Sequence, residues 1–165
     1  MGKAIAPAPP RMLTANDLVG AWSLQRFWVT KPDGARFFPY GQDAMGTLLY
    51  TATGWMSADL CRADRGSDDI ASLEYAASAD PDQRLRAYDG YTSYSGRYEL
   101  QPRIPDASGS TAVDVLHHIE LALAPAMIGQ TLRRTATLAA DELALRYSVR
   151  SRSGLDTYRL TWTRA

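Results

Sequence analysis

Apolar and polar residues alternate along most of this chain, with a period of two that is typical of β-strands buried on one face. The alternating stretches are short, and they are separated by residues that favour turns, as in Lys31–Gly34 and Thr53–Gly54. Many short strands with hairpin-length connections predict an all-β fold, an antiparallel up-and-down β-barrel of about 8–10 strands. The prediction rests on the segments 21–30, 36–39, 46–52, 55–60, 88–100, 111–123, 130–138, 142–150 and 155–164.

One or two short helices and two irregular segments complete the prediction. Residues 1–12 are rich in proline and predict a flexible arm. A helical turn is expected at Thr14–Leu18, and a helix at Pro81–Ala87, where Asp80 can cap the first turn. The segment Arg62–Asp82 is polar and lacks periodicity, so we expect a loop or lid that leads into the second helix.

The strand predicted at 111–123 holds both histidines of the chain, and they point to opposite faces because they are adjacent. His117 falls on the apolar face, while His118 and Glu120 lie side by side on the other, where the carboxylate can orient the imidazole. Which histidine faces a cavity stays open at this point. The apolar face comprises Val113, Val115, His117, Ile119, Leu121 and Leu123, and the mixed face Asp114, Leu116, His118, Glu120 and Ala122.

An arginine stands on the apolar face of the following strand, at 130–138, where Arg134 alternates with Leu132, Ala136 and Leu138. A charge on such a face is costly unless it is paired. Arg134 is therefore expected to meet an anionic or polar group. That group is either a carboxylate, enolate or phenolate of a ligand or an internal partner, and the internal candidates are Glu99, Glu120 and Asp59.

Aromatic residues supply the other candidate contacts. Tyr94 and Tyr98 share one face of the strand predicted at 88–100, and phenols that line a cavity can donate hydrogen bonds to a carbonyl. The first strand is expected to place Trp22, Leu24 and Trp28 on one face. The full set of expected ligand contacts is Tyr98, Trp28, Tyr50, Trp55, Glu120 and Met127.

Composition excludes several classes of function. Lys and Arg together number 18, as do Asp and Glu, and this balance argues against a partner such as nucleic acid or an anionic membrane surface. Cys61 is the only cysteine, so an intramolecular disulfide is impossible. Two histidines on opposite faces cannot chelate a metal together, and we expect neither a metal nor a cofactor. The start of the chain lacks a signal-peptide pattern, so a cytoplasmic protein is expected, with a homodimer left open.

Several short motifs together resemble the lipocalin-like domain proteins, single-domain bacterial and fungal relatives of the lipocalin barrel. The resemblance covers most of residues 13–165, which we take as the barrel domain, and it implies a ligand-sized interior. Trp22 follows Gly20, as in the opening signature of lipocalins, where a late arginine covers the tryptophan; Arg164 can fill that role. The family usually has an aromatic residue near the turn at Pro125, and Ala126, Met127 and Ile128 stand there instead. The motifs are LVGAW (18–22), PYG (39–41), GTLLYT (46–51), TGWMSA (53–58), YTSYSGRY (91–98), HH (117–118) and LTWTR (160–164), with Pro125, Gly129 and Arg134.

Two functions fit this sequence. The barrel binds a small, partly apolar organic molecule, cyclic or aromatic, or it is a cofactor-independent cyclase, isomerase or dehydratase that acts on a polyketide- or terpenoid-like substrate. As an enzyme it would use His117 or His118 as acid and base near pH 6–7, Tyr94 and Tyr98 as hydrogen-bond donors, and Arg134 to stabilise an enolate-like charge. Either function predicts a pocket of roughly 300–1,000 Å³ lined by Tyr94, Tyr98, Arg134 and one histidine.

Overall fold

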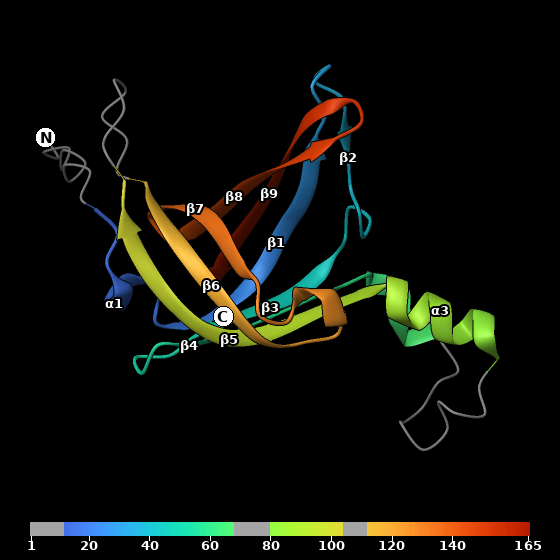
Figure 1. Cartoon of the computed structure of the whole chain (residues 1–165), viewed down its shortest axis with the longest axis horizontal. Coiled ribbons are helices and arrows are strands. Elements are labelled where there is room, and N and C mark those ends of the chain that lie inside the picture. Colours follow the sequence, from blue (N-terminus) through green and yellow to red (C-terminus); the bar gives the residue numbers. More distant parts are fainter. Residues whose placement is uncertain (1–11, 68–79, 104–111) are drawn as a thin grey trace, which may run out of the picture.

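The computed structural model describes residues 12–67, 80–103 and 112–165 of the chain (Figure 1). Most of the predicted arm at 1–12 and much of the predicted loop at 62–82 lie outside these residues. Within them the fold is built almost entirely of strands. The strands are β1 (Gly20–Thr30), β2 (Arg36–Phe37), β3 (Met45–Tyr50), β4 (Trp55–Cys61), β5 (Tyr91–Pro102), β6 (Val113–Ala122), β7 (Thr131–Ala139), β8 (Glu142–Ser151) and β9 (Gly154–Arg164).

Eight of these strands form a closed antiparallel barrel. Neighbours pair in the order β1, β3, β4, β5, β6, β7, β8 and β9, and pairing of β1 with β9 closes the sheet. The short β2 pairs with the last two residues of β1 and extends one rim. Closure removes the exposed edges that an open sheet would present to other chains. The predicted all-β, up-and-down barrel is confirmed, and the predicted strands agree with the observed ones to within a few residues.

Short helical segments lie at the two ends of the barrel. The α-helix α1 (Ala15–Leu18) precedes β1, and α3 (Pro81–Asp89) precedes β5 and projects from the opposite end (Figure 1). Two 3₁₀ turns follow β4 and β6, η1 (Ala63–Ser67) and η2 (Pro125–Met127). Asp80 caps α3, accepting a hydrogen bond from the Asp82 backbone N–H at 2.8 Å, as the sequence predicts.

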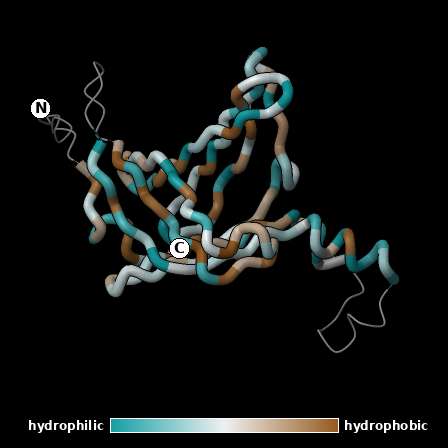
Figure 2. The backbone as a smooth tube through the Cα atoms, viewed as in Figure 1, coloured by the Kyte–Doolittle hydropathy of each residue, from teal (hydrophilic) through white to brown (hydrophobic). Residues whose placement is uncertain are grey.

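The core fills the half of the barrel next to α1. Apolar and polar residues alternate along the strands (Figure 2), and the burial pattern places the apolar set on the inner face, as in β4. The largest fully buried side chains are Trp22, Trp162, Tyr50, Leu18, Leu48 and Leu143. Burial of side chains this large supplies most of the favourable free energy of folding. The barrel is therefore packed at one end, and a ligand site can lie only towards the other.

Candidate functional site

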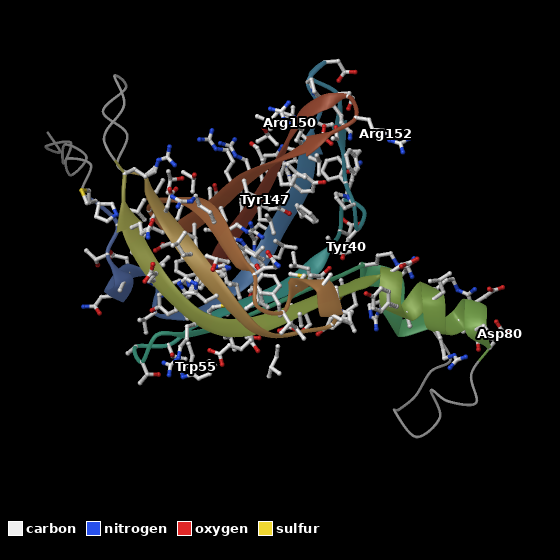
Figure 3. The ribbon with its side chains drawn as sticks, in the orientation of Figure 1. Tyr40, Trp55, Asp80, Tyr147, Arg150 and Arg152 are labelled. Carbon is white, nitrogen blue, oxygen red and sulfur yellow. The ribbon has the colours of Figure 1, made fainter. Side chains whose placement is uncertain are left out.

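A cavity of about 340 Å³ lies in the half of the barrel away from α1. This volume falls in the range typical of small-molecule sites. Figure 3 labels two of its aromatic residues, Tyr147 on β8 and Tyr40 in the segment between β2 and β3. The apolar wall includes Phe27, Leu48, Leu60, Leu145, Leu160 and Trp162. The polar residues of the wall are Tyr40, Thr92, Tyr94, Arg134, Tyr147 and Tyr158.

A β-bulge in β1 decides which aromatic residue of this strand reaches the cavity. The pairing with β9 shifts between Leu24 and Arg26, so that Gln25 is an extra residue. One extra residue inverts the alternation beyond it. Phe27 is consequently buried and lines the cavity, while Trp28 points outward. The prediction that Trp28 shares a face with Leu24 is wrong for this reason.

A second bulge, in β6, lies just after the histidines. His117 is fully buried on the inner face, and His118 lies on the outer face. The pairing of β5 with β6 then shifts opposite Gly96, which makes Glu120 the extra residue. Leu121 therefore points outward and is 69% exposed, contrary to the alternating pattern that placed it inside. The structure thus answers the open question: His117 is the inward histidine.

His117 lies behind the cavity wall and does not line it. Its Nε2 is 2.8 Å from the Tyr50 hydroxyl, and its Nδ1 is 3.4 Å from the Tyr94 hydroxyl. Burial, with a smaller contribution from the nearby positive charge of Arg134, lowers the pKa of His117 to about 3. The imidazole is therefore neutral at physiological pH, and the expected titration of the inward histidine near pH 6–7 does not hold.

The two predicted tyrosines of β5 have different positions. Tyr94 lines the cavity, with its hydroxyl facing His117. Tyr98 lies deeper, towards α1, where its hydroxyl donates to the Thr51 carbonyl at 2.9 Å and its ring meets the edge of Tyr50 at 4.7 Å between ring centroids. Of the two phenols, Tyr94 can contact a ligand, while Tyr98 and Tyr50 belong to the packed half.

Arg134 reaches the cavity from β7, as its place on an apolar face predicts. The pairing of β7 with β8 ends at Thr135 and Arg146, so Arg134 and Tyr147 face each other one residue beyond, where the two strands separate. The Arg134 guanidinium carbon lies 3.8 Å from the centroid of the Tyr147 ring. This stacking over an aromatic face is a favourable cation–π contact.

The internal salt bridges that were considered for Arg134 are absent among the described residues. Its one hydrogen bond there is to the neighbouring Arg133 carbonyl, at 3.2 Å. Of the expected acids, Asp59 accepts from the Tyr91 hydroxyl at 2.6 Å, and Glu99 lies 3.8 Å from His118. The guanidinium therefore lines the cavity without a carboxylate partner in the part of the chain that the structure describes.

The packed end carries a tryptophan and an arginine in contact. The Trp22 indole nitrogen donates to the Leu18 carbonyl at 2.8 Å, which ties β1 to α1. The Arg164 guanidinium carbon lies 4.4 Å from the Trp22 ring centroid, and its nitrogens donate to the Val19 and Asp17 carbonyls. Arg164 thus covers the tryptophan that follows α1, as the resemblance implied.

A family model described as a lipocalin-like domain matches residues 19–165, which is nearly the whole chain. The chain belongs to this lipocalin-like domain family. Comparison with curated proteins and with solved structures gives no match. Membership of the family supports ligand binding by the barrel in general.

Two tryptophans that were expected to contact a ligand lie on the outside of this lipocalin-like barrel. Trp55 is 40% exposed and stacks under Arg97, whose guanidinium carbon is 4.2 Å from the ring centroid. The guanidinium carbons of Arg36 and Arg159 lie over the Trp28 ring, 5.9 and 5.7 Å from its centroid. Neither tryptophan lines the cavity. Alternation alone placed Trp28 inside, because a bulge cannot be read from it.

The expected pairing of His118 with Glu120 is also not found. The bulge makes Glu120 the unpaired residue of β6, and its side chain is exposed. His118 instead meets residues of the flanking strands, with its Nδ1 2.9 Å from the Thr131 hydroxyl and its Nε2 3.8 Å from Glu99. His118 and Glu120 are thus surface residues of the outer wall.

The cavity adjoins a surface cleft, and we take this junction as its entrance; two of the residues there, Tyr40 and Thr92, were not among the expected contacts. Tyr40, Thr92 and Met127 line both the cavity and an adjoining surface cleft, of which Tyr88 is also a part. The Tyr40 hydroxyl is hydrogen-bonded to the Thr92 hydroxyl, which links the segment before β3 to β5. Met127, on η2, was among the expected contacts. The local sequence around Tyr40 predicts only a turn, so its position in the cavity wall becomes visible only in the folded structure.

Two further aromatic residues of the site had a signal in the sequence. Tyr147 and Tyr158 fall on the inner faces that alternation predicts for β8 and β9. Their rings stack with centroids 4.7 Å apart, and burial raises the pKa of Tyr147 to about 12. The Tyr147 phenol is therefore a neutral hydrogen-bonding group beside the guanidinium.

The described residues show neither a metal-binding cluster nor a membrane-spanning helix. Within 12–67, 80–103 and 112–165, three or more His, Cys, Asp or Glu side chains nowhere gather as metal ligands would. In the same residues, every helix is too short or too polar to cross a membrane. Cys61 is a free thiol of intermediate exposure.

Proposed function

We propose that this lipocalin-like protein binds a small, partly apolar organic molecule, cyclic or aromatic, inside the barrel. The observation that carries the proposal is the cavity of about 340 Å³ whose wall is mostly aromatic and aliphatic. An apolar ligand enclosed there gains the free energy of removing its own surface and that of the wall from water. Sites of this kind combine such a wall with a few placed polar groups.

The aromatic residues of the wall support a ring-containing ligand. Phe27 contacts both Tyr40 and Tyr158, at 6.0 and 6.3 Å between ring centroids, and Tyr147 stacks on Tyr158. These rings belong to the neighbouring strands β8, β9 and β1 and to the segment before β3, so they form one continuous aromatic side of the cavity. Offset or edge-on contacts with a planar ligand would add to the free energy gained from burial.

A titration with a neutral aromatic dye tests the proposal. N-phenyl-1-naphthylamine fluoresces more strongly in apolar surroundings, and we expect a saturable increase at a stoichiometry of one dye per chain. Ala58 is buried and lines the cavity, so Ala58→Phe should abolish the increase by occupying the space. Its neighbour Ser57 faces the other side of β4, so Ser57→Phe adds the same ring outside the barrel and should leave binding intact.

Two results would contradict the proposal. One is the absence of saturable binding by the folded wild-type protein. The other is equal dye affinity of Ala58→Phe and wild type, which would mean that the dye binds to another surface of the protein. If Ala58→Phe does not fold, as judged by circular dichroism, the smaller change Ala58→Leu gives the same comparison with a partial loss of affinity.

The hydrogen-bonded chain from Tyr94 to His117 and Tyr50 favours a second candidate function, a cofactor-independent isomerase, cyclase or dehydratase. Solvent water would take the α-proton, Tyr94 can donate a hydrogen bond to the substrate carbonyl, and Arg134 can stabilise the enolate that forms. His117, neutral and behind the wall, would orient the Tyr94 hydroxyl as a positioning residue. A suitable probe is deuterium exchange at the α-carbon of 2-tetralone. Catalysis is favoured if the wild-type protein accelerates the exchange and Tyr94→Phe loses this acceleration while it still binds tetralone. If the wild-type protein does not accelerate the exchange, catalysis is excluded for this class of ketone.

A further inference from the structure

Arg134 is the charged residue of the cavity wall. The described residues that line the cavity are otherwise apolar or carry a hydroxyl. The flat face of the guanidinium is covered by the Tyr147 ring at 3.8 Å, which leaves the N–H groups along its edge for hydrogen bonding. One of these groups donates to the Arg133 carbonyl, and the other described contacts of Arg134 include no carboxylate.

The adjacent Arg133, unlike Arg134, is paired with a carboxylate. Arg133 faces outward and lies 2.7 Å from Asp114, which also accepts from Arg103 at 2.8 Å and from the Thr135 hydroxyl at 3.1 Å. Burial alone would raise the pKa of Asp114, but the hydrogen bonds from the two arginines and the threonine hold that pKa below its usual value. The exposed Arg133 is thus paired with a carboxylate, while the half-buried Arg134 has no carboxylate partner among the described residues.

Trp162, a residue of the wall, has a buried donor without an acceptor among the described residues. Trp162 lines the cavity, and its indole Nε1 is buried with no hydrogen-bond partner among the described residues. Buried polar groups of folded proteins are normally paired, and an unpaired one has a cost. None of the described residues that line the cavity is acidic, so its donors meet no carboxylate there.

We infer that the molecule bound in the cavity is an organic anion, a ring-containing compound whose oxyanion pairs with the edge of Arg134. The inference rests on the proposed binding function and assigns the charge of the ligand. A carboxylate, phenolate or enolate meets the requirement, because each presents oxygen acceptors to a planar guanidinium. The rings of Tyr147 and Tyr158 border the apolar part of the same molecule.

Competition between two matched compounds tests the charge. Naphthalene-2-carboxylate and naphthalene-2-carboxamide have the same ring and nearly the same shape, but only the first is charged at pH 7.5. Each is titrated against the protein loaded with N-phenyl-1-naphthylamine, and the loss of dye fluorescence gives an inhibition constant. We expect the carboxylate to bind about 10- to 100-fold more tightly than the amide, the usual gain from a charge-assisted hydrogen bond.

Neighbouring arginines on β7 provide the variant and its control. Arg134→Met keeps much of the side-chain length without the charge, and it should bring the carboxylate-to-amide ratio close to one while the dye still binds. Arg133→Met removes a charge of the same strand on the outer face and should keep the wild-type ratio. If Arg134→Met does not fold, Arg134→Gln serves in its place, and the wild-type ratio alone still decides the charge.

The possible outcomes separate the two proposals. Dye binding with equal constants for carboxylate and amide in the wild-type protein overturns the anion and leaves the binding function standing. A wild-type preference that persists in Arg134→Met or Arg134→Gln overturns the assignment to Arg134. Failure of the dye to bind wild type at all contradicts the proposed function itself.

Discussion

The backbone of Gly96 lies directly against the carbonyl oxygen of His118. A β-carbon built on Gly96 would be 1.9 Å from that oxygen, well inside any permitted contact. The close approach occurs where the bulge at Glu120 bends β6 towards β5. The strand pair therefore needs a residue without a side chain at position 96, opposite the bulge.

Gly96→Ala should therefore destabilise the barrel by about 3 kcal/mol or more, since the new methyl group meets backbone that cannot rotate away. Gly41→Ala is the control, because Gly41 has open space around it, so that a β-carbon there is opposed only by the positive φ of 83°. The control should lose only about 1–2 kcal/mol, the cost of a left-handed conformation. Urea unfolding of both variants gives the comparison. Equal losses would mean that the contact with His118 relaxes at little cost.

The fold could be predicted from the sequence because each strand alternates and each turn has suitable residues. The site was harder, since two bulges invert the alternation at Gln25 and Glu120. Nothing in the local sequence distinguishes Trp28 from an inward residue, or Leu121 from a buried one. Arg134 was correctly placed on an inner face because no bulge precedes it in β7. That no acidic residue of the described chain pairs with Arg134 becomes clear only in the assembled barrel.

The Trp22 side chain is a packing element of the closed end, and its removal should affect stability rather than binding. Trp22→Ala leaves a large void and an uncovered Arg164, so we expect a loss of about 3–5 kcal/mol in the free energy of unfolding. Trp55→Ala, at a site 40% exposed, should cost less than about 1 kcal/mol. Dye affinity should be kept by the folded fraction of both variants. A specific loss of binding in Trp22→Ala at full stability would place Trp22 in the site.

The hydrogen bond between Tyr40 and Thr92 should control how fast a ligand enters and leaves. Tyr40→Phe keeps the ring in the wall but removes the link across the entrance, so both rate constants for N-phenyl-1-naphthylamine should rise about 2- to 10-fold, while the equilibrium constant changes less. Stopped-flow fluorescence measures both rates. Tyr88→Phe is the matched control, because Tyr88 lines the surface cleft next to Tyr40 but does not line the cavity inside the barrel. Unchanged rates in Tyr40→Phe would exclude this residue as a gate.

The buried His117 should make the stability of the barrel depend on pH. Its pKa is about 3 in the folded protein and about 6.5 in an unfolded chain, so between these values the unfolded state binds a proton that the folded state does not. The free energy of unfolding should therefore fall as the pH is lowered below 6.5, by up to about 1.4 kcal/mol per pH unit from this group. Above pH 6.5 the contribution is constant, because both states are then neutral at this position.

His117→Gln isolates that contribution from the carboxyl groups that titrate in the same range. Gln cannot be protonated but can still hydrogen-bond to Tyr50 and Tyr94, so the variant should be less stable than wild type at pH 7.5 and should lose less stability between pH 6.5 and 4.5. Urea unfolding at several pH values measures the two slopes, and His118→Gln, on the outer face, should keep the wild-type slope. Parallel curves for wild type and His117→Gln would show that the imidazole takes up its proton without unfolding of the barrel. Protons would then reach His117 through the folded wall, and a role for this histidine in proton transfer by way of Tyr94 would regain support.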